Sequence, residues 1–240
     1  MTERPGDSVT RNLSEFVIGP SRVHWDGEAL HIDIDEWTVP IPRRISGRVS
    51  VYPDQLFDFS TPLDPLQNHY WGPIAPSAKV RVDLSNPSQS WRGHAYVDSN
   101  EGNEPIAKSF TEWDWSRSLM SDGSTCVIYD CQFIKGEDHL LALRFLKNGS
   151  IESFQAPIRQ KFQKTAWGLH RRLRSDRDVR VIQQLEDTPF YQRSLLEHRL
   201  LGEDCVCFHE TLNAIRFDSA WVQKLLPWRM PRLSYRNLKY

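Results

Sequence analysis

Short runs in which apolar and polar residues alternate dominate the chain, and a period of two is typical of half-buried β-strands. Turn signals separate the runs, for example Asp26-Gly27, Asp122-Gly123 and Asn148-Gly149. Strands at this spacing predict an all-β protein built of barrels or sandwiches. The runs that we interpret as strands are Ser21–Trp25, Ala29–Asp35, Ile45–Tyr52, Ala78–Leu84, Trp91–Asp98, Ser109–Leu119, Thr125–Phe133, His139–Leu146, Ile151–Phe154, Val179–Leu185, Tyr191–Leu200, Asp204–Thr211 and Ala214–Phe217.

Three segments depart from this alternation. Ser219–Leu226 has the spacing of a helix. The Pro-rich stretch Thr61–Pro65 is interpreted as a long loop or an interdomain crossing. Gln155–Asp178 is interpreted as an irregular, solvated loop, with a phosphate or lipid-headgroup contact as the alternative. Its basic cluster, which continues just past its end, consists of Arg171, Arg172, Arg174, Arg177 and Arg180.

Composition narrows the function classes. The 240 residues are 39% hydrophobic with 9 Trp and 11 Phe, so the aromatic excess fits either core packing or an aromatic-lined pocket. A net charge of −1 gives no reason to expect nucleic-acid binding. No apolar run reaches the ~20 residues of a membrane helix, and Met1–Asn12 is too polar for a signal peptide. Since four cysteines fit a reducing compartment, we expect a cytoplasmic protein with at most peripheral membrane contact.

Candidate chemistry gathers on two segments. In the strand predicted for Trp91–Asp98, alternation places His94, Tyr96 and Asp98 on one face, and a turn-rich stretch follows at residues 99–105. If residues 68–73 are also extended, His69 and Trp71 share a face. The two segments could then direct an imidazole, an indole, a phenol and one carboxyl group into a single cavity. Without a thiol or hydroxyl nucleophile, this set suits proton transfer to an apolar substrate.

Two further groups of side chains are candidates for a functional role, one as an acid and one as a metal site. Asp114, between Trp113 and Trp115, is a second candidate acid, although an ion pair with Arg117 or another cation is the alternative. Cys205, Cys207 and His209 fall on one face of a predicted strand, but this spacing is not a zinc-finger pattern, so no metal is expected. Asn148-Gly149-Ser150 matches a glycosylation sequon and is interpreted as a hairpin turn.

Residues 93–117 resemble the signature of the carotenoid 1,2-hydratases, also called hydroxyneurosporene synthases. The likeness continues in the same order over nearly the whole chain, in the segments Ile18–Ser21, Trp25–Gly27, Ile32–Glu36, Pro40–Arg44, Gly47–Val49, Trp71–Pro76, Leu185–Tyr191 and Leu226–Arg232. It implies tandem lipocalin-like (calycin) barrels, with residues 1–74 as the remainder of the first barrel and 75–240 as the second. It also favours a strand over a helix at residues 190–200. Because the match begins partway through the family pattern, we expect the first barrel to be incomplete.

The resemblance also implies an activity and its residues. Such enzymes add water to the terminal 1,2 double bond of an acyclic carotenoid of the neurosporene or lycopene type, in phototrophic bacteria and without a cofactor. Carried over to this chain, Asp98 would protonate the alkene, Trp71 and Tyr96 would stabilise the carbocation, and His69 would take the proton of the attacking water. Burial among apolar groups favours the protonated form that a donating carboxyl needs. A non-catalytic carrier of an apolar ligand, or a related hydratase or cyclase, remains an alternative, and the preferred carotene and the oligomeric state stay open.

Overall fold

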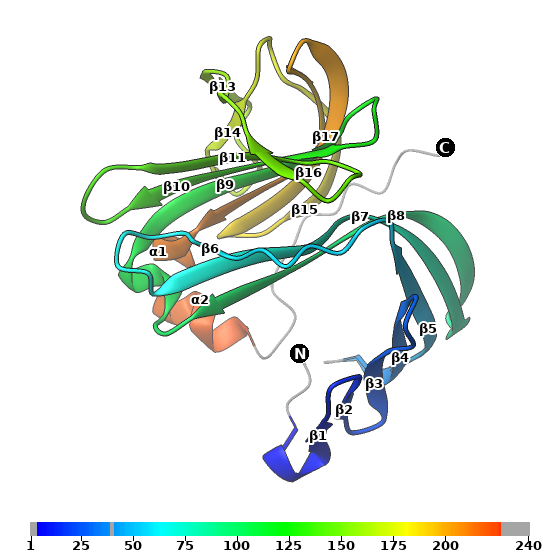
Figure 1. The fold of residues 1–240 in the computed structure, drawn as a ribbon. Coiled ribbons are helices and arrows are strands. Elements are labelled where there is room, and N and C mark those ends of the chain that lie inside the picture. The colour runs from blue at the N-terminus through cyan, green and yellow to red at the C-terminus, as the bar shows by residue number, and fades with distance from the viewer. Residues whose placement is uncertain (1–3, 39–40, 227–240) are drawn as a thin grey trace. The chain divides into compact units, whose positions relative to one another are not determined.

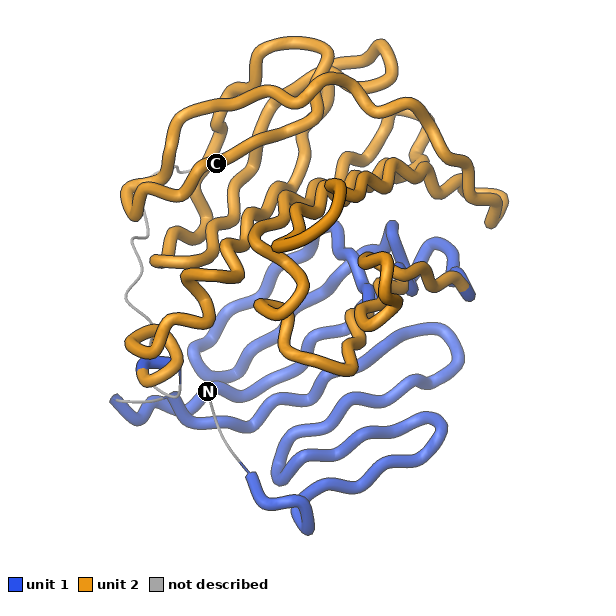
Figure 2. The backbone as a smooth tube through the Cα atoms, turned by 90° about the vertical axis from the view of Figure 1, so that its left-hand side faces the viewer, with its two compact units in different colours: residues 1–58, 73–98, 225–229 blue, residues 59–72, 99–224, 230–240 orange. Residues whose placement is uncertain are grey.

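The computed structural model describes residues 4–38 and 41–226. Within this part the chain is all-β, as predicted, and its strands form antiparallel sheets. The described chain divides into two compact units (Figure 2): unit 1 comprises residues 4–38, 41–58, 73–98 and 225–226, and unit 2 comprises residues 59–72 and 99–224. The predicted division into residues 1–74 and 75–240 stays a prediction. Of the segments quoted for the resemblance, Pro40 and the tail from Pro227 lie outside the described residues.

Unit 1 is a meander of antiparallel strands in which each strand pairs with the next (Figure 1). Its elements are η1 (Gly6–Ser8), β1 (Val9–Arg11), β2 (Glu15–Ile18), β3 (Ser21–Trp25), β4 (Leu30–Trp37), β5 (Arg44–Pro53), most of β7 (His69–Asn86) and most of β8 (Ser88–Gly102). Its core consists of small and β-branched side chains, among them Val51, Ala78 and Val80, and Ala95 and Val97 of β8 pack against them.

The long strands β7 and β8 carry the chain between the two units. Residues 69–72 of β7 and residues 99–102 of β8 belong to unit 2, and the remainder of both strands belongs to unit 1. The prediction that residues 68–73 are extended is therefore confirmed from His69 onward. The predicted turn at residues 99–105 is wrong in its first part, since β8 continues to Gly102 before η2 (Ile106–Lys108).

Unit 2 contains a sheet in the order β12-β11-β10-β9-β17-β16-β15 and the separate hairpin β13-β14 (Figure 1). The strands of the sheet are β9 (Phe110–Leu119), β10 (Thr125–Phe133), β11 (His139–Phe145), β12 (Ile151–Ser153), β15 (Arg180–Asp187), β16 (Tyr191–Leu200) and β17 (Glu203–Asn213). The two-residue β6 (Thr61–Pro62) pairs with the start of β7. The hairpin between β11 and β12 places Gly149 at a positive φ of 86°, which confirms the turn predicted at Asn148-Gly149.

Two predictions of local structure in unit 2 are wrong. Residues 155–178 are not an irregular loop throughout, because β13 (Arg159–Phe162) and β14 (Arg171–Arg174) pair there. Residues Ala214–Phe217 form the helix α1 instead of a strand, since the side chain of Asn213 accepts a hydrogen bond from the backbone N–H of Arg216 and so caps a helical turn. The helix predicted at residues 219–226 is confirmed as α2 (Ala220–Leu225). No helix in the described residues has the length and apolar character needed to cross a membrane.

Candidate functional site

A cavity of about 500 Å³ lies within unit 2, and its volume falls in the range of small-molecule sites. It is bordered by the start of β7, the end of β8, η2, β9, β10 and the end of α1. Most of its wall is apolar or aromatic. The lining residues are Leu63, His69, Tyr70, Asn100, Glu101, Gly102, Glu104, Pro105, Ile106, Ala107, Phe110, Trp113, Tyr129, Phe217 and Asp218. None of these side chains is a thiol or an aliphatic hydroxyl, so the wall offers proton-transfer groups and no such nucleophile.

A tight loop before β7 fixes the position of His69. The backbone N–H of Leu63 donates to the carbonyl of His69 at 2.8 Å, and Gln67, at a left-handed φ of 56°, donates its N–H to the carbonyl of Asp64. The Asp64 carboxylate accepts the backbone N–H of His69 at 2.8 Å. Local hydrogen bonds therefore hold the start of β7, because a side-chain acceptor satisfies the first N–H of the strand.

The imidazole of His69 is enclosed on several sides. Its Nε2 lies 3.1 Å from the backbone carbonyl of Glu104, and its Nδ1 lies 3.3 Å from Oδ1 of Asp64. The Phe110 ring meets it edge-on at 4.9 Å between centroids, and a Cβ on Gly102 would come within 2.8 Å of Cδ2. Because a carbonyl oxygen only accepts, Nε2 carries the hydrogen and Nδ1 faces the carboxylate.

Asp64 is a functional candidate that the sequence reasoning missed. It and His69 are both almost fully buried, at 5% and 4% exposure. Oδ2 of Asp64 and Nδ1 of His69 are buried without an aligned hydrogen bond among the described residues. Such atoms are uncommon in native interiors and call for an explanation. In the sequence, Asp64 lies in the Pro-rich stretch that was interpreted as a loop. The available signal was that an Asp, a residue type that often caps turns, stands five positions before the candidate His69.

Trp71 belongs to an aromatic cluster beside the cavity. It is fully buried, and its ring meets those of Tyr129 and Phe145 edge-on at 5.7 and 6.3 Å. Tyr129, in turn, lies 6.1 Å from Trp113, and both of these rings line the cavity. Trp71 thus supports the cavity wall through Tyr129, and it is not itself among the lining side chains.

Tyr96 and Asp98 lie on the part of β8 that belongs to unit 1, and both are half-buried. The predicted alternation is confirmed, because Ala95 and Val97 pack on the core of unit 1 and the side chains between them point to the opposite face. His69 and Trp71 are together in unit 2. That all four side chains converge on one pocket stays a prediction.

Asp114 forms an ion pair, which confirms one of the two interpretations of this residue. Its carboxylate lies 3.3 Å from Nε of Arg172, accepts the hydroxyl of Thr211 at 2.6 Å and lies 3.5 Å from Nε2 of His209. Arg172 also pairs with Glu112. A carboxylate with these partners is committed to a buried polar network, so it is a poor candidate for a proton donor.

The interpretation of the arginine cluster as a solvated loop is wrong for its members on β14. Arg171 is 4% exposed and donates to the carbonyl of Gln163, and burial lowers its pKa. Arg174 pairs with the buried Asp130 at 2.8 Å, and Arg159 pairs with the same carboxylate. Arg159 and Arg174 neutralise Asp130 of β10, as Arg172 neutralises the acids of β9, and sequence spacing could not predict these pairs.

Cys205, Cys207 and His209 share a face of β17, but Cys207 is packed in an apolar cluster and the other two have partners of their own. Nε2 of His209 contacts the carbonyl of Arg172 at 2.9 Å, and Nδ1 contacts Gln192. Sγ of Cys205 lies 3.2 Å from Nε2 of His198. Burial raises the thiol pKa of Cys205 and Cys207, which disfavours the thiolate. No group of three metal-binding side chains occurs in the part of the chain that the structure describes.

His198 should make the stability of the protein pH-dependent. Burial, with a smaller contribution from His209, lowers its pKa from 6.5 to about 4. As the pH falls, His198 is protonated in the unfolded chain before it is protonated in the folded chain. The free energy of unfolding is therefore highest above pH 6.5 and decreases as the pH drops toward 4. Between pH 7 and pH 5 we expect a loss of about 2 kcal/mol from this residue, at ~1.4 kcal/mol per pKa unit.

Urea unfolding of the wild type and of His198→Gln at pH 7, 6 and 5 measures this dependence. The variant will be less stable at pH 7, because glutamine disturbs the contacts with Ser118 and Cys205, but its stability should change less with pH. Parallel pH profiles for the two proteins would contradict the assignment.

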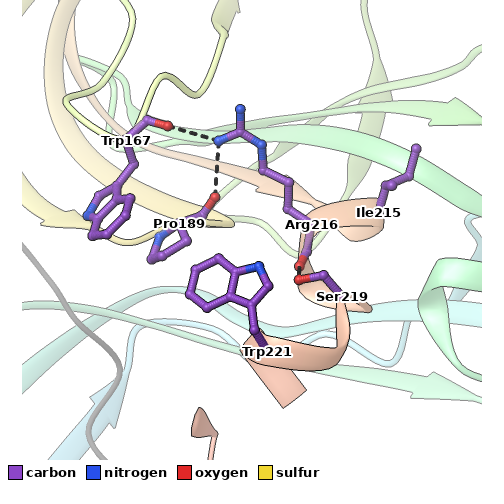
Figure 3. A pocket seen from close by; sticks show the side chains of 6 residues that line it. All are labelled: Trp167, Pro189, Ile215, Arg216, Ser219 and Trp221. Atoms are coloured by element: carbon purple, nitrogen blue, oxygen red, sulfur yellow. Dashed lines mark hydrogen bonds between the residues drawn. The ribbon is translucent and has the colours of Figure 1, made fainter. Parts of the chain in front are cut away.

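A second, smaller hollow of about 340 Å³ lies in unit 2 around α1 and α2 (Figure 3). Its lining residues are Trp167, Pro189, Ile215, Arg216, Ser219 and Trp221. The guanidinium of Arg216 donates to the carbonyls of Trp167 and Pro189 at 2.9 and 3.2 Å, and the hydroxyl of Ser219 donates to the carbonyl of Arg216 (Figure 3). The charged group is thus directed to the backbone, and aromatic and aliphatic side chains form the rest of the wall.

Comparison with known proteins identifies the family. The family model described as "Carotenoid hydratase CrtC" matches residues 1–239. The chain belongs to the CrtC family. Curated relatives include the acyclic carotenoid 1,2-hydratases of Rubrivivax gelatinosus and Thiocapsa roseopersicina, which are 51% and 44% identical over 97% of this chain. The chain spans 58% of the length of each of these two relatives.

Other comparisons extend the likeness. The acyclic carotenoid 1,2-hydratase of Rhodobacter capsulatus is 33% identical over 97% of this chain and 83% of its own length. Among solved structures, a putative AttH from Nitrosomonas europaea superposes with a TM-score of 0.60 over 87% of this chain and 72% of its own, at 12% identity. At that identity the CrtC chain shares the fold of AttH, and the comparison shows nothing about activity.

Proposed function

We propose that this CrtC chain hydrates the terminal 1,2 double bond of acyclic carotenoids of the neurosporene or lycopene type. The observation that carries the proposal is 51% identity over 97% of the chain to a relative named as an acyclic carotenoid 1,2-hydratase. The cavity in unit 2 supports it, because an apolar, aromatic wall with a few acids and one histidine suits a hydrocarbon that must be protonated.

The proposed reaction adds one water molecule without a cofactor. A carboxylic acid, Asp98, donates a proton to C2 of the alkene, and the electron pair of the double bond forms the new C–H bond. The tertiary cation left at C1 is stabilised by the aromatic faces of Trp71 and Tyr96, each contributing roughly 0.5–2 kcal/mol. Water then attacks C1 and loses a proton, so a tertiary alcohol is formed and no net charge remains.

His69 and Asp64 together are the proposed acceptor of the proton that water loses. With Nε2 directed to the carbonyl of Glu104, Nδ1 and Oδ1 of Asp64 face each other at 3.3 Å with opposed lone pairs. One added proton would convert this contact into a charge-assisted hydrogen bond. In this proposal Asp64 acts through His69, since His69 lines the cavity and Asp64, which contacts it, is not among the lining residues.

Oxygen labelling tests the proposed function. The chain is incubated with lycopene in water enriched in ¹⁸O, beside the Rubrivivax gelatinosus relative as a positive control, and products are analysed by mass spectrometry. We expect a labelled tertiary alcohol. Retention of lycopene without any labelled product, under conditions in which the relative reacts, would instead favour a carrier.

We also propose, as the resemblance implies, that the chain is built of two tandem lipocalin-like barrels. The antiparallel topology and the AttH-like fold support this architecture. For its location we propose the cytoplasm, with peripheral membrane contact, because a carotenoid substrate dissolves in lipid and not in water. Cell fractionation, with the protein released from membranes by mild detergent, tests this location.

A further inference from the structure

The corner formed by α1 and α2 borders both the large cavity at His69 and the smaller hollow of Figure 3. Phe217 and Asp218, at the end of α1, line the large cavity. Ile215 and Arg216, on the same helix, line the small hollow together with Trp221 of α2. A single short segment therefore separates the candidate site from an apolar surface.

This corner presents large apolar side chains to solvent while its own backbone is firmly held. Ile215 is 60% exposed, Trp221 49% and Trp167 36%. Ala214 and Val222, in contrast, are fully buried, and α1 packs against β9, β17 and η2 of unit 2. Exposed aliphatic and indole side chains on a fixed scaffold mark an interaction surface when they gather in one place, and all three line the hollow of Figure 3.

The character of the corner favours lipid as its partner. Nη1 of Arg216 is held by two backbone carbonyls, which directs this side chain toward the protein, so the exposed apolar side chains dominate the rest of the surface (Figure 3). Tryptophan is the side chain most suited to the boundary between headgroups and acyl chains, and an aliphatic neighbour adds apolar area that the bilayer can bury. An acyclic carotenoid has to leave the bilayer next to its site, and the α1–α2 corner is an apolar surface that adjoins the cavity.

We propose that the α1–α2 corner docks unit 2 on a lipid bilayer through Trp167, Ile215 and Trp221. Docking there would bring the cavity wall at Phe217 to the lipid surface, so that an apolar substrate could enter without crossing water. The inference rests on the proposed function for its substrate, whereas the docking itself is measured without substrate.

Vesicle flotation tests the docking. The wild type is mixed with vesicles of zwitterionic phosphatidylcholine, or of phosphatidylcholine with an anionic lipid, at low and high salt, beside Ile215→Ser/Trp221→Ser. The matched control is Trp91→Ser, since Trp91 is 47% exposed but lies on β8 in unit 1. We expect the double variant to lose at least about tenfold in partitioning, because two large apolar side chains would no longer be buried in the bilayer. The control should bind as the wild type does, and salt should have little effect.

Three results would overturn the proposal. The first is a double variant that floats like the wild type, and the second is a wild type that floats only with anionic vesicles at low salt. The third is wild-type self-association that the double variant loses in gel filtration, because a second copy would then cover the corner. Circular dichroism checks that each variant is folded. A wild type that floats as expected yet forms no labelled alcohol would contradict the proposed function alone.

Discussion

Replacement of Asp98 by asparagine is expected to abolish hydration of an acyclic carotenoid while binding of the carotenoid persists. The amide keeps the size of the side chain but has no acidic proton to give. General acid catalysis contributes about 10²–10⁴-fold, and an alkene without other activation should lie at the upper end. Binding should survive because it comes from apolar area, and Asp98→Asn removes none. Initial rates of labelled-alcohol formation and a carotenoid binding titration measure the two effects separately.

The control for this experiment comes from the cavity itself. Asp218 lines the cavity in unit 2 and is solvent-exposed, so Asp218→Asn tests a competing acid with little risk to folding. We expect this variant to keep most of the wild-type rate. Asp114, the second acid considered from the sequence, is a worse control, because its loss would remove one of the two carboxylates that pair with Arg172 and the acceptor of the buried Thr211 hydroxyl. An active Asp98→Asn protein beside an inactive Asp218→Asn protein would show that Asp218, and not Asp98, is the proton donor.

Local sequence patterns predicted those parts of the fold that depend on neighbouring residues. Alternation located the strands, and it correctly separated Ala95 and Val97 from the side chains on the opposite face of β8. It also marked residues 125–133 and 191–200, which became β10 and β16 within a residue of their expected bounds. It failed at Ala214–Phe217, where four residues fit either state and the cap from Asn213 decides.

Contacts between distant strands were beyond these patterns. Arg174 and Asp130 are 44 positions apart, yet pairing between them keeps both charges inside unit 2. An arginine-rich stretch is usually solvated, and only the presence of acids on strands that fold against it reverses that expectation. The candidate site shows the same limit. The resemblance pointed to His69 and Trp71, but not to the carboxylate beside His69 or to the wall formed by Phe110, Trp113 and Tyr129.

Two spaces in unit 2, one beside Asp114 and one at His69, also bear on the choice between an enzyme and a non-catalytic carrier. The network of Asp114, Arg172 and His209 leaves a space of only about 10 Å³ beside it, which is too small for a hydrocarbon. The cavity at His69 is about fifty times larger and its wall is mainly apolar. A simple carrier needs only that apolar wall, because burial of hydrocarbon area suffices for binding. It does not need a buried Asp64–His69 pair in which Nδ1 of His69 and Oδ2 of Asp64 lack a hydrogen bond among the described residues, and we take that pair as the feature that favours chemistry.

Replacement of Asp64 by asparagine is expected to lower kcat about 10²-fold with little change in KM. Oδ1 of Asp64 accepts the backbone N–H of His69 at 2.8 Å, and the amide oxygen of asparagine can keep that bond and the loop that depends on it. The negative charge is lost, however, so the pair can no longer hold the proton released by water, and the effect should match the low end for a general base. Asp54→Asn is the matched control, since Asp54 is exposed in unit 1 and accepts a hydrogen bond from Ser77.

Two measurements separate a chemical role of Asp64 from a structural one. ¹⁵N NMR of the His69 ring reports which nitrogen carries the hydrogen, and we expect Nε2–H in both proteins, with the Nδ1 signal shifted by the asparagine amide. Thermal unfolding should change little, because the capping bond is retained. A fall in kcat that follows a large loss of stability, or equal losses in kcat and carotenoid binding, would reduce Asp64 to a support of the loop. An unchanged kcat would show that water loses its proton to another group, and His69 would then serve only as part of the cavity wall.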